Sequence, residues 1–223
     1  MTVPDGGLRA GGADDDESDA DWPDARDCDD WRASILATDD WTELDLDPAT
    51  RHRSIRKSVR DAVRRKTVRQ PDAVRVIRHL EQLAKRAHDD GAFYCASLVV
   101  ADDPARSSLV SNVTMQLVPC DLGGELAFRT PPDMCGWLSQ CFSDEYGEYG
   151  DSRADIVTLP RVGPAVRHEV LAGGVLLQFF VPLPVLRPTA FVLLTFTCPC
   201  PPFAALTTKL FDVMATSLQL HCD

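Results

Sequence analysis

Two apolar segments near the C-terminus, residues 175–182 and 190–198, place the strongest constraint on how this chain can fold. In the first segment one strand face carries Val175, Leu177, Phe179 and Val181, and the opposite face carries Leu176 and Phe180. The second segment, AFVLLTFT followed by Cys198, likewise has apolar residues on both strand faces. A strand that is apolar on both faces must be covered on both faces. The two segments therefore predict a sheet that lies between helical layers.

The flanking sequence supplies further strands and one covering helix. The stretch DIVTLPRVGPAVRHEVLAGG predicts a strand, a proline turn, a second strand and a hairpin. We expect the pair Gly173-Gly174 to provide the positive φ angles of a two-residue turn. A final helix is expected over about 201–219. Its core-facing residues are expected to be Phe203, Leu206, Leu210, Val213, Met214 and Leu218.

The first half of the chain predicts a helix pair followed by two strands. Asp47-Pro48 is typical of a helix start and predicts a helix over about 48–67, and Pro71 opens a second helix that ends at Gly91. Strands are expected over 92–101 and 108–118. The second strand has one face with Asn112, Thr114 and Gln116, a half-polar pattern that indicates an edge strand or a thinly covered face. Residues 120–153 predict one short helix near 131–143 and a polar loop.

The predicted fold is an α+β protein: an α/β/α sandwich with a mostly antiparallel sheet that helices cover on both faces. We expect residues 1–30 to form a disordered acidic tail and residues 31–223 to form a single domain, with residues 120–153 as an insert. The start of the chain has no basic region followed by an apolar stretch, and no apolar segment is long enough to span a bilayer. We therefore expect no secretory signal, no lipid anchor, no membrane span and a cytoplasmic location.

Charge is separated along the chain, whose formal net charge is −11. Residues 1–48 contain 16 acidic and 3 basic residues, whereas residues 49–90 contain 13 basic and 5 acidic residues. The basic helices are a candidate anion-binding face with Arg51, Arg53, Arg60, Arg64, Arg65 and Arg69. The acidic total and the lack of interleaved aromatic residues count against a nucleic-acid partner. The tail either stays solvated or folds back over these helices as an internal competitor.

Eight cysteines in a chain expected in a reducing compartment indicate free thiols. Cys198 and Cys200 each precede a proline, which favours extended backbone and places their side chains on the same side of the chain. We expect them to be structural, at a strand end that leads into the last helix. Zinc binding and redox chemistry are the alternatives. Zinc would need further ligands from Cys95, Cys120, Cys135, Cys141 or His168, whose spacing matches no zinc finger.

The sequence contains no recognised catalytic or phosphate-binding motif. His168 and Glu169 are neighbours in an expected strand and would point to opposite faces, so they do not form an acid–base pair. We expect no enzymatic activity, no catalytic residues, no cofactor and no metal.

The stretches VTLPRVGPAVRHEV, LLQFFVPLP, FVLLTFTCPCP and LFDVMATSLQL resemble actinobacterial proteins of uncharacterised function with a PsbP-like sandwich domain. This fold is also used by the Ran-binding Mog protein and the mycobacterial LpqN lipoproteins. The resemblance is strongest over 154–220, weaker over 31–118, and absent from the tail and the insert. These motifs are packing patterns, so the resemblance implies the fold and brings no catalytic set. It also implies a binding role, because understood members mostly bind partners.

Three classes of function remain at this point. The first is a non-enzymatic protein-binding or adaptor domain with an unknown partner, which the resemblance links to actinobacterial secretion or envelope systems. The second is anion or nucleic-acid binding through the basic helices of 49–90. The third is a small-molecule-binding domain or an unrecognised enzyme, which a pocket with convergent polar groups would favour. The sequence does not indicate whether the chain is a monomer or a homodimer.

Overall fold

A computed structural model describes residues 31–100, 109–119, 130–145, 151–183 and 190–222. The expected acidic tail 1–30, the turn at 102–104 and much of the expected insert lie outside these residues. Within the described part, a seven-stranded sheet has the strand order β2-β3-β4-β8-β7-β6-β5, and all neighbouring strands are antiparallel. The strands of this sheet are β2 (Trp41–Glu43), β3 (Ala92–Val100), β4 (Leu109–Pro119), β5 (Asp151–Leu159), β6 (Gly163–Leu171), β7 (Val175–Pro182) and β8 (Ala190–Cys198).

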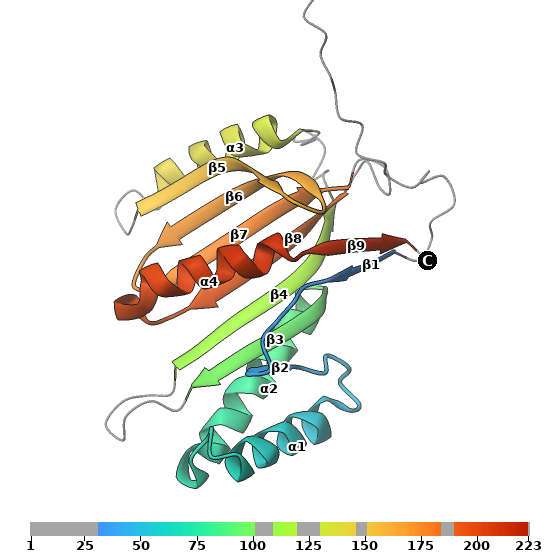
Figure 1. The fold of residues 1–223 in the computed structure, drawn as a ribbon, viewed down its shortest axis with the longest axis vertical. Helices are drawn as coiled ribbons and strands as arrows, with labels where there is room; N and C mark the ends of the chain where they lie inside the picture. The colour runs from blue at the N-terminus through green and yellow to red at the C-terminus, as the bar shows by residue number, and fades with distance from the viewer. Residues whose placement is uncertain (1–30, 101–108, 120–129, 146–150, 184–189, 223) are drawn as a thin grey trace, which may run out of the picture.

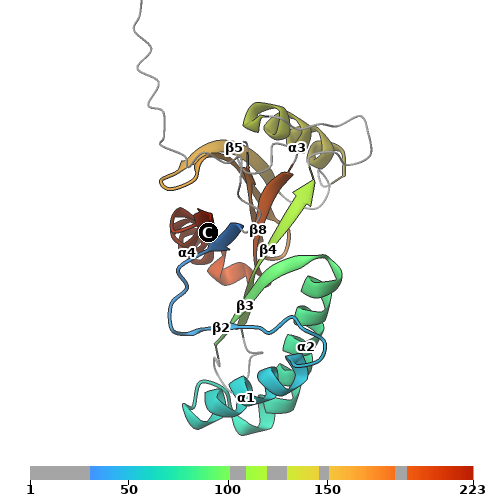
Figure 2. The same ribbon diagram turned by 90° about the vertical axis from the view of Figure 1, so that its right-hand side faces the viewer.

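Helices lie on both faces of the sheet (Figures 1 and 2). The helix α4 (Ala204–Thr216) crosses one face, together with a short ribbon of β1 (Trp31–Ser34) paired with β9 (Gln219–Cys222). On the opposite face, α1 (Arg51–Arg64) and α2 (Ala73–Asp89) lie at the β3 end, and α3 (Pro131–Glu145) lies over β5 and β6. Short 3-10 turns at Gln70–Asp72 and Pro201–Phe203 precede α2 and α4. The predicted α+β class and the two-sided helical cover are confirmed.

Three clusters of buried side chains form the core. The largest, the α4 cluster, joins the inner faces of β4, β7 and β8 to Phe211, Met214 and Ala215 of α4. The α2 cluster packs α1 and α2 around Cys95 of β3. The α3 cluster packs Met134 and Leu138 against β6, β7 and β8. Because the helix of the expected insert covers sheet surface, it is part of the sandwich core.

The hairpin between β6 and β7 uses its two glycines for different physical reasons. Gly173 has φ +68°, a left-handed conformation that favours glycine. At Gly174 the constraint is space, because a Cβ there would lie 2.6 Å from the carbonyl oxygen of Cys198. The expectation that both glycines supply positive φ is therefore wrong for Gly174, whose missing side chain lets β7 start beside the end of β8.

Several element boundaries differ from those the sequence predicts. The first helix begins at Arg51 rather than near Pro48, although Asp47 still accepts hydrogen bonds from the amides of Ala49 through Oδ1 (2.8 Å) and of Arg51 through its carbonyl (2.8 Å). The last helix ends at Thr216, and the short strands β1, β2 and β9 were not predicted. The predicted end of the second helix at Gly91 is confirmed by its φ of +77°.

Candidate functional site

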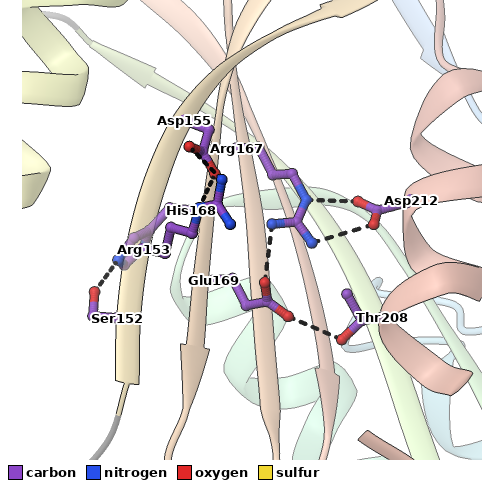
Figure 3. Close-up of polar contacts among 8 residues, drawn as sticks. All are labelled: Ser152, Arg153, Asp155, Arg167, His168, Glu169, Thr208 and Asp212. Carbon is purple, nitrogen blue, oxygen red and sulfur yellow. Dashed lines mark hydrogen bonds and ion pairs between the residues drawn. The ribbon is translucent and has the colours of Figure 1, made fainter. Parts of the chain in front are cut away.

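An ion-pair network on the α4 side of the sheet fixes how α4 is rotated (Figure 3). The guanidinium of Arg167 on β6 donates two hydrogen bonds to Asp212 of α4, at 2.7 and 3.2 Å, and one to Glu169 at 3.0 Å. The hydroxyl of Thr208 donates to the other oxygen of Glu169 at 3.1 Å. Burial alone would lower the pKa of Arg167, but the hydrogen bonds to Asp212 and Glu169 outweigh it and raise the pKa. The network therefore holds one side of α4 against β6.

With α4 held this way, its buried side consists of Thr207, Phe211, Met214 and Ala215. The ring of Phe211 stacks on Phe196 of β8, with centroids 4.8 Å apart. Leu206 and Val213, which the sequence places in the core, are instead 69% and 67% exposed, and Phe203 just before the helix is 40% exposed. The predicted core side of this helix is therefore wrong at these three residues. We refer to Phe203, Leu206 and Val213 as the α4 outer face.

The opposite face of the sheet contains a hollow beside α2. Strands β4 and β8 are interior strands, and here they present Asn112, Thr114, Gln116, Thr195 and Thr197. These residues form the floor of a groove of about 400 Å³, and α2 forms its wall. The sequence left two interpretations of the half-polar face of β4. The interpretation as an edge strand is wrong, because β4 is the third of the seven strands in the sheet. The interpretation as a thinly covered face is confirmed by the groove.

The wall of the groove carries His79, Gln82, Leu83, Arg86, Ala87 and Asp90. Burial and the nearby charge of Arg86 lower the pKa of His79, so this imidazole is neutral at neutral pH. Arg86 and Asp90 carry opposite charges. The side chains that line the groove therefore carry no net charge, and most of them both donate and accept hydrogen bonds.

The six arginines of the expected anion-binding face are not all together. Arg53, Arg60 and Arg64 lie on the exposed side of α1, opposite the buried Ile55 and Val59. Arg51 has a buried Nη1 and lies at the side of α1 that faces α2. Arg65 lines a separate cavity of about 480 Å³, and Arg69 pairs with Asp72 at 2.6 Å.

Two further basic residues lie on the exposed side of α1, and the six arginines predicted from the sequence did not include them. Arg56 and Lys57 are exposed and share that side with Arg53, Arg60 and Arg64. The spacing of three and four residues among these five positions is the signal that finds them. We refer to these five residues as the α1 basic face.

The thiols with described side chains are distributed over the three core clusters. Cys198 is buried in the α4 cluster, and Cys200 packs against the same cluster. The sulfur of Cys198 accepts a hydrogen bond from the hydroxyl of Thr207 at 3.7 Å. Cys95 belongs to the α2 cluster and Cys135 to the α3 cluster. Cys95, Cys135, Cys198 and Cys200 are free, and burial raises the pKa of Cys95 to about 12. Cys198 thus occupies a packing position, as the structural interpretation of this pair expects.

His168 and Glu169 point to opposite faces of β6, as their adjacency predicts. His168 is fully buried, with Nδ1 at 3.1 Å from Oε1 of Gln178 and Nε2 at 3.0 Å from the hydroxyl of Ser152. Since an amide oxygen can only accept, Nδ1 carries the proton and donates to Gln178. Burial lowers the pKa of His168, although the hydrogen bond to Gln178 acts in the opposite direction.

In the described ranges, no three His, Cys, Asp or Glu side chains gather closely enough to hold a metal ion. The helices of that same part of the chain are too short or too polar to cross a membrane. Neither a protein-family model nor a curated protein sequence matches the chain.

Proposed function

We propose that this protein is a non-enzymatic binding domain whose α4 outer face docks on a partner protein. The single observation that carries the proposal is the exposure of Leu206 and Val213, two turns apart on one side of a helix whose other side is already buried. A helix on the surface of a globular protein normally turns its large apolar residues toward the core. Leu206 and Val213 therefore lack the cover that large apolar residues normally have.

The spacing on α4 indicates the kind of partner. Phe203, Leu206 and Val213 follow each other at three and seven residues, close to the anchor spacing of helices that bind in apolar grooves of other proteins. Between Leu206 and Val213 lie two charged residues: Asp212, which is paired with Arg167, and Lys209, which is exposed. A partner with an apolar groove and a carboxylate at its rim would match this face.

The ion-pair network supports a binding face that is preorganised. Arg167 and Glu169 hold Asp212 and Thr208 of the same helix, so the anchors have a fixed direction before any partner arrives (Figure 3). Preorganisation lowers the entropic cost of association. The resemblance to the PsbP-like sandwich supports a binding role by analogy, and the free thiols support a reducing, cytoplasmic setting for the partner.

The proposal is tested by the double substitution Leu206→Glu and Val213→Glu. Both side chains are largely exposed, so the variant should keep the thermal unfolding midpoint of the parent protein. Its affinity for a partner identified by crosslinking in native cells and then purified should fall about thirtyfold or more, because a hot-spot residue contributes about 2 kcal/mol or more. Titration calorimetry of the two purified proteins measures this loss.

The matched control is Val74→Glu, which places the same charge on α2 at a valine that is 68% exposed. This variant should bind the partner as the parent does. Equal partner binding by the double variant and the parent would overturn the proposal. So would a concentration-dependent dimer that the double substitution abolishes, because the α4 outer face would then bind a second copy of this chain.

A further inference from the structure

The polar groove beside α2 lies on the other side of the sheet from the α4 outer face and is independent of partner docking. On the α4 side of the two interior strands, Val113, Met115 and Leu194 are apolar and have no exposed surface. On the groove side the same two strands place hydroxyl and amide groups in adjacent pairs, Asn112 opposite Thr197 and Thr114 opposite Thr195. Burying such groups without partners costs stability.

One polar atom in the groove lacks any partner among the described residues. The amide nitrogen of Asn112 donates to Thr197 at 3.4 Å, which turns Oδ1 of the same side chain away from that hydroxyl. This Oδ1 is buried and has no hydrogen bond. An unsatisfied buried acceptor costs about 1–3 kcal/mol, and this oxygen reaches a donor on a bound molecule only when the Asn112 side chain rotates toward the groove.

The charges and the size of the groove restrict what such a molecule can be. The floor is uncharged, and the wall carries one cation, Arg86, and one anion, Asp90. The floor runs from Asn112 to Gln116, about 13 Å of extended strand at roughly 3.3 Å per residue. The volume of about 400 Å³ lies within the range of small-molecule sites, which is about 300–1,000 Å³.

From these observations we propose that the groove binds a small hydroxyl-rich molecule without net charge, of about the size of a disaccharide. A hydroxyl group both donates and accepts, so it complements threonine and amide side chains that do the same. Rotation of the Asn112 side chain onto such a hydroxyl would also give its Oδ1 the donor that it lacks. The ligand lies along the floor between β4 and β8, with α2 at its side. Arg86 and Asp90 remain at the solvent edge and take no essential part in binding.

The experiment titrates the full chain with three probes: trehalose as the neutral hydroxyl-rich molecule, glycylglycine as a zwitterion and citrate as an anion. Saturation-transfer NMR detects binding and calorimetry measures the affinity. We expect trehalose to bind and the two charged probes not to bind. Asn112→Leu and, as a second variant that preserves side-chain volume, Thr195→Val should each weaken trehalose binding about tenfold, as the loss of a hydrogen bond to a buried group implies.

Two controls separate this site from a structural role of the same residues. Thr158→Val makes the same change on an exposed threonine of β5 and should leave trehalose affinity unchanged. Arg78→Gln, which removes a charge from an exposed residue of α2 that does not line the groove, should change it less than twofold. The proposal is overturned if trehalose does not bind and Asn112 is satisfied by ordered water only. It is equally overturned if glycylglycine or citrate binds instead, or if Thr195→Val binds trehalose like the parent protein.

Discussion

At the residue scale, His168 is a titratable group held neutral in the core. Its ring is fully buried between Gln178 and Ser152, and burial lowers its pKa from the ordinary value of 6.5. The unfolded chain therefore binds a proton more readily than the folded chain in the range just below 6.5. The stabilising contribution of the neutral ring is complete above pH 6.5 and is lost as the pH falls toward the lowered value.

This gives a prediction for His168→Gln. As the pH falls below about 6.5, the free energy of unfolding of the parent should decrease more steeply than that of the variant, because the variant has lost this titration. Urea denaturation at a series of pH values measures the difference. Identical slopes for His168→Gln and the parent would show that the buried ring does not titrate in this range.

Residue patterns in the sequence predict some of these features and miss others. The opposite orientations of His168 and Glu169 follow from strand alternation alone. The thin cover over Asn112 follows from the sequence of its strand, in which polar residues alternate with apolar ones. The close approach at Gly174 depends on where the end of β8 lies, which no local pattern contains. The unsatisfied oxygen of Asn112 likewise depends on the position of a residue 85 places away, Thr197.

At the element scale, the position of α4 depends on a long-range ion pair. The side chain of Arg167 is 14% exposed, whereas Arg153, which pairs with Asp155 on β5, is 74% exposed. Removing one partner of a buried pair is far more costly than removing one of an exposed pair, because a charge is left without compensation in the core. The two arginines therefore form a matched comparison.

We predict that Arg167→Met lowers the free energy of unfolding by about 2 kcal/mol, below the cost of breaking a fully buried pair because Asp212 is partly exposed. Arg153→Met should change it by less than about 0.5 kcal/mol. Urea denaturation at neutral pH measures both values. Similar losses for the two variants would contradict the assignment of Arg167 as the residue that fixes α4.

The sequence predicts that α4 exists, but the buried side that it predicts is wrong at Leu206 and Val213. These two residues form as good an apolar stripe as Phe211 and Met214, so periodicity alone does not separate the two sides. The ion pair between Arg167 and Asp212, 45 residues apart, decides between them. The strand β9 was missed for a related reason, since its four residues are ordered by pairing with β1 at the other end of the chain.

At the scale of the whole molecule, cations of α1 gather on one exposed face, the α1 basic face. The helix α1 lies at one end of the molecule (Figure 2), and its basic face carries five cations although the chain as a whole has a net charge of −11. Among its five residues, Arg64 contacts Asp61 at 3.3 Å, which reduces its availability. Such a face is suited to weak, nonspecific contact with a polyanion.

We predict that any binding of heparin by the full chain is lost in steps as these residues are replaced by glutamine. The slope of log affinity against log salt should fall by about one for each cation removed, because each contact releases a counterion. Fluorescence titration at several salt concentrations measures the slope. Arg75→Gln on α2, which pairs with Asp72 at 3.0 Å, is the control and should leave it unchanged. Flat salt dependence of the parent would remove this face as an anion site.

The pairing of β1 with β9 has a mechanical consequence. Trp31 lies opposite Cys222 in an antiparallel ribbon, so the two ends of the described chain leave the molecule side by side. A force that pulls these ends apart acts across the ribbon and opens its backbone hydrogen bonds one after another, a loading direction that strand pairs resist poorly. Tension would release this ribbon first, while the seven-stranded sheet remained closed behind it.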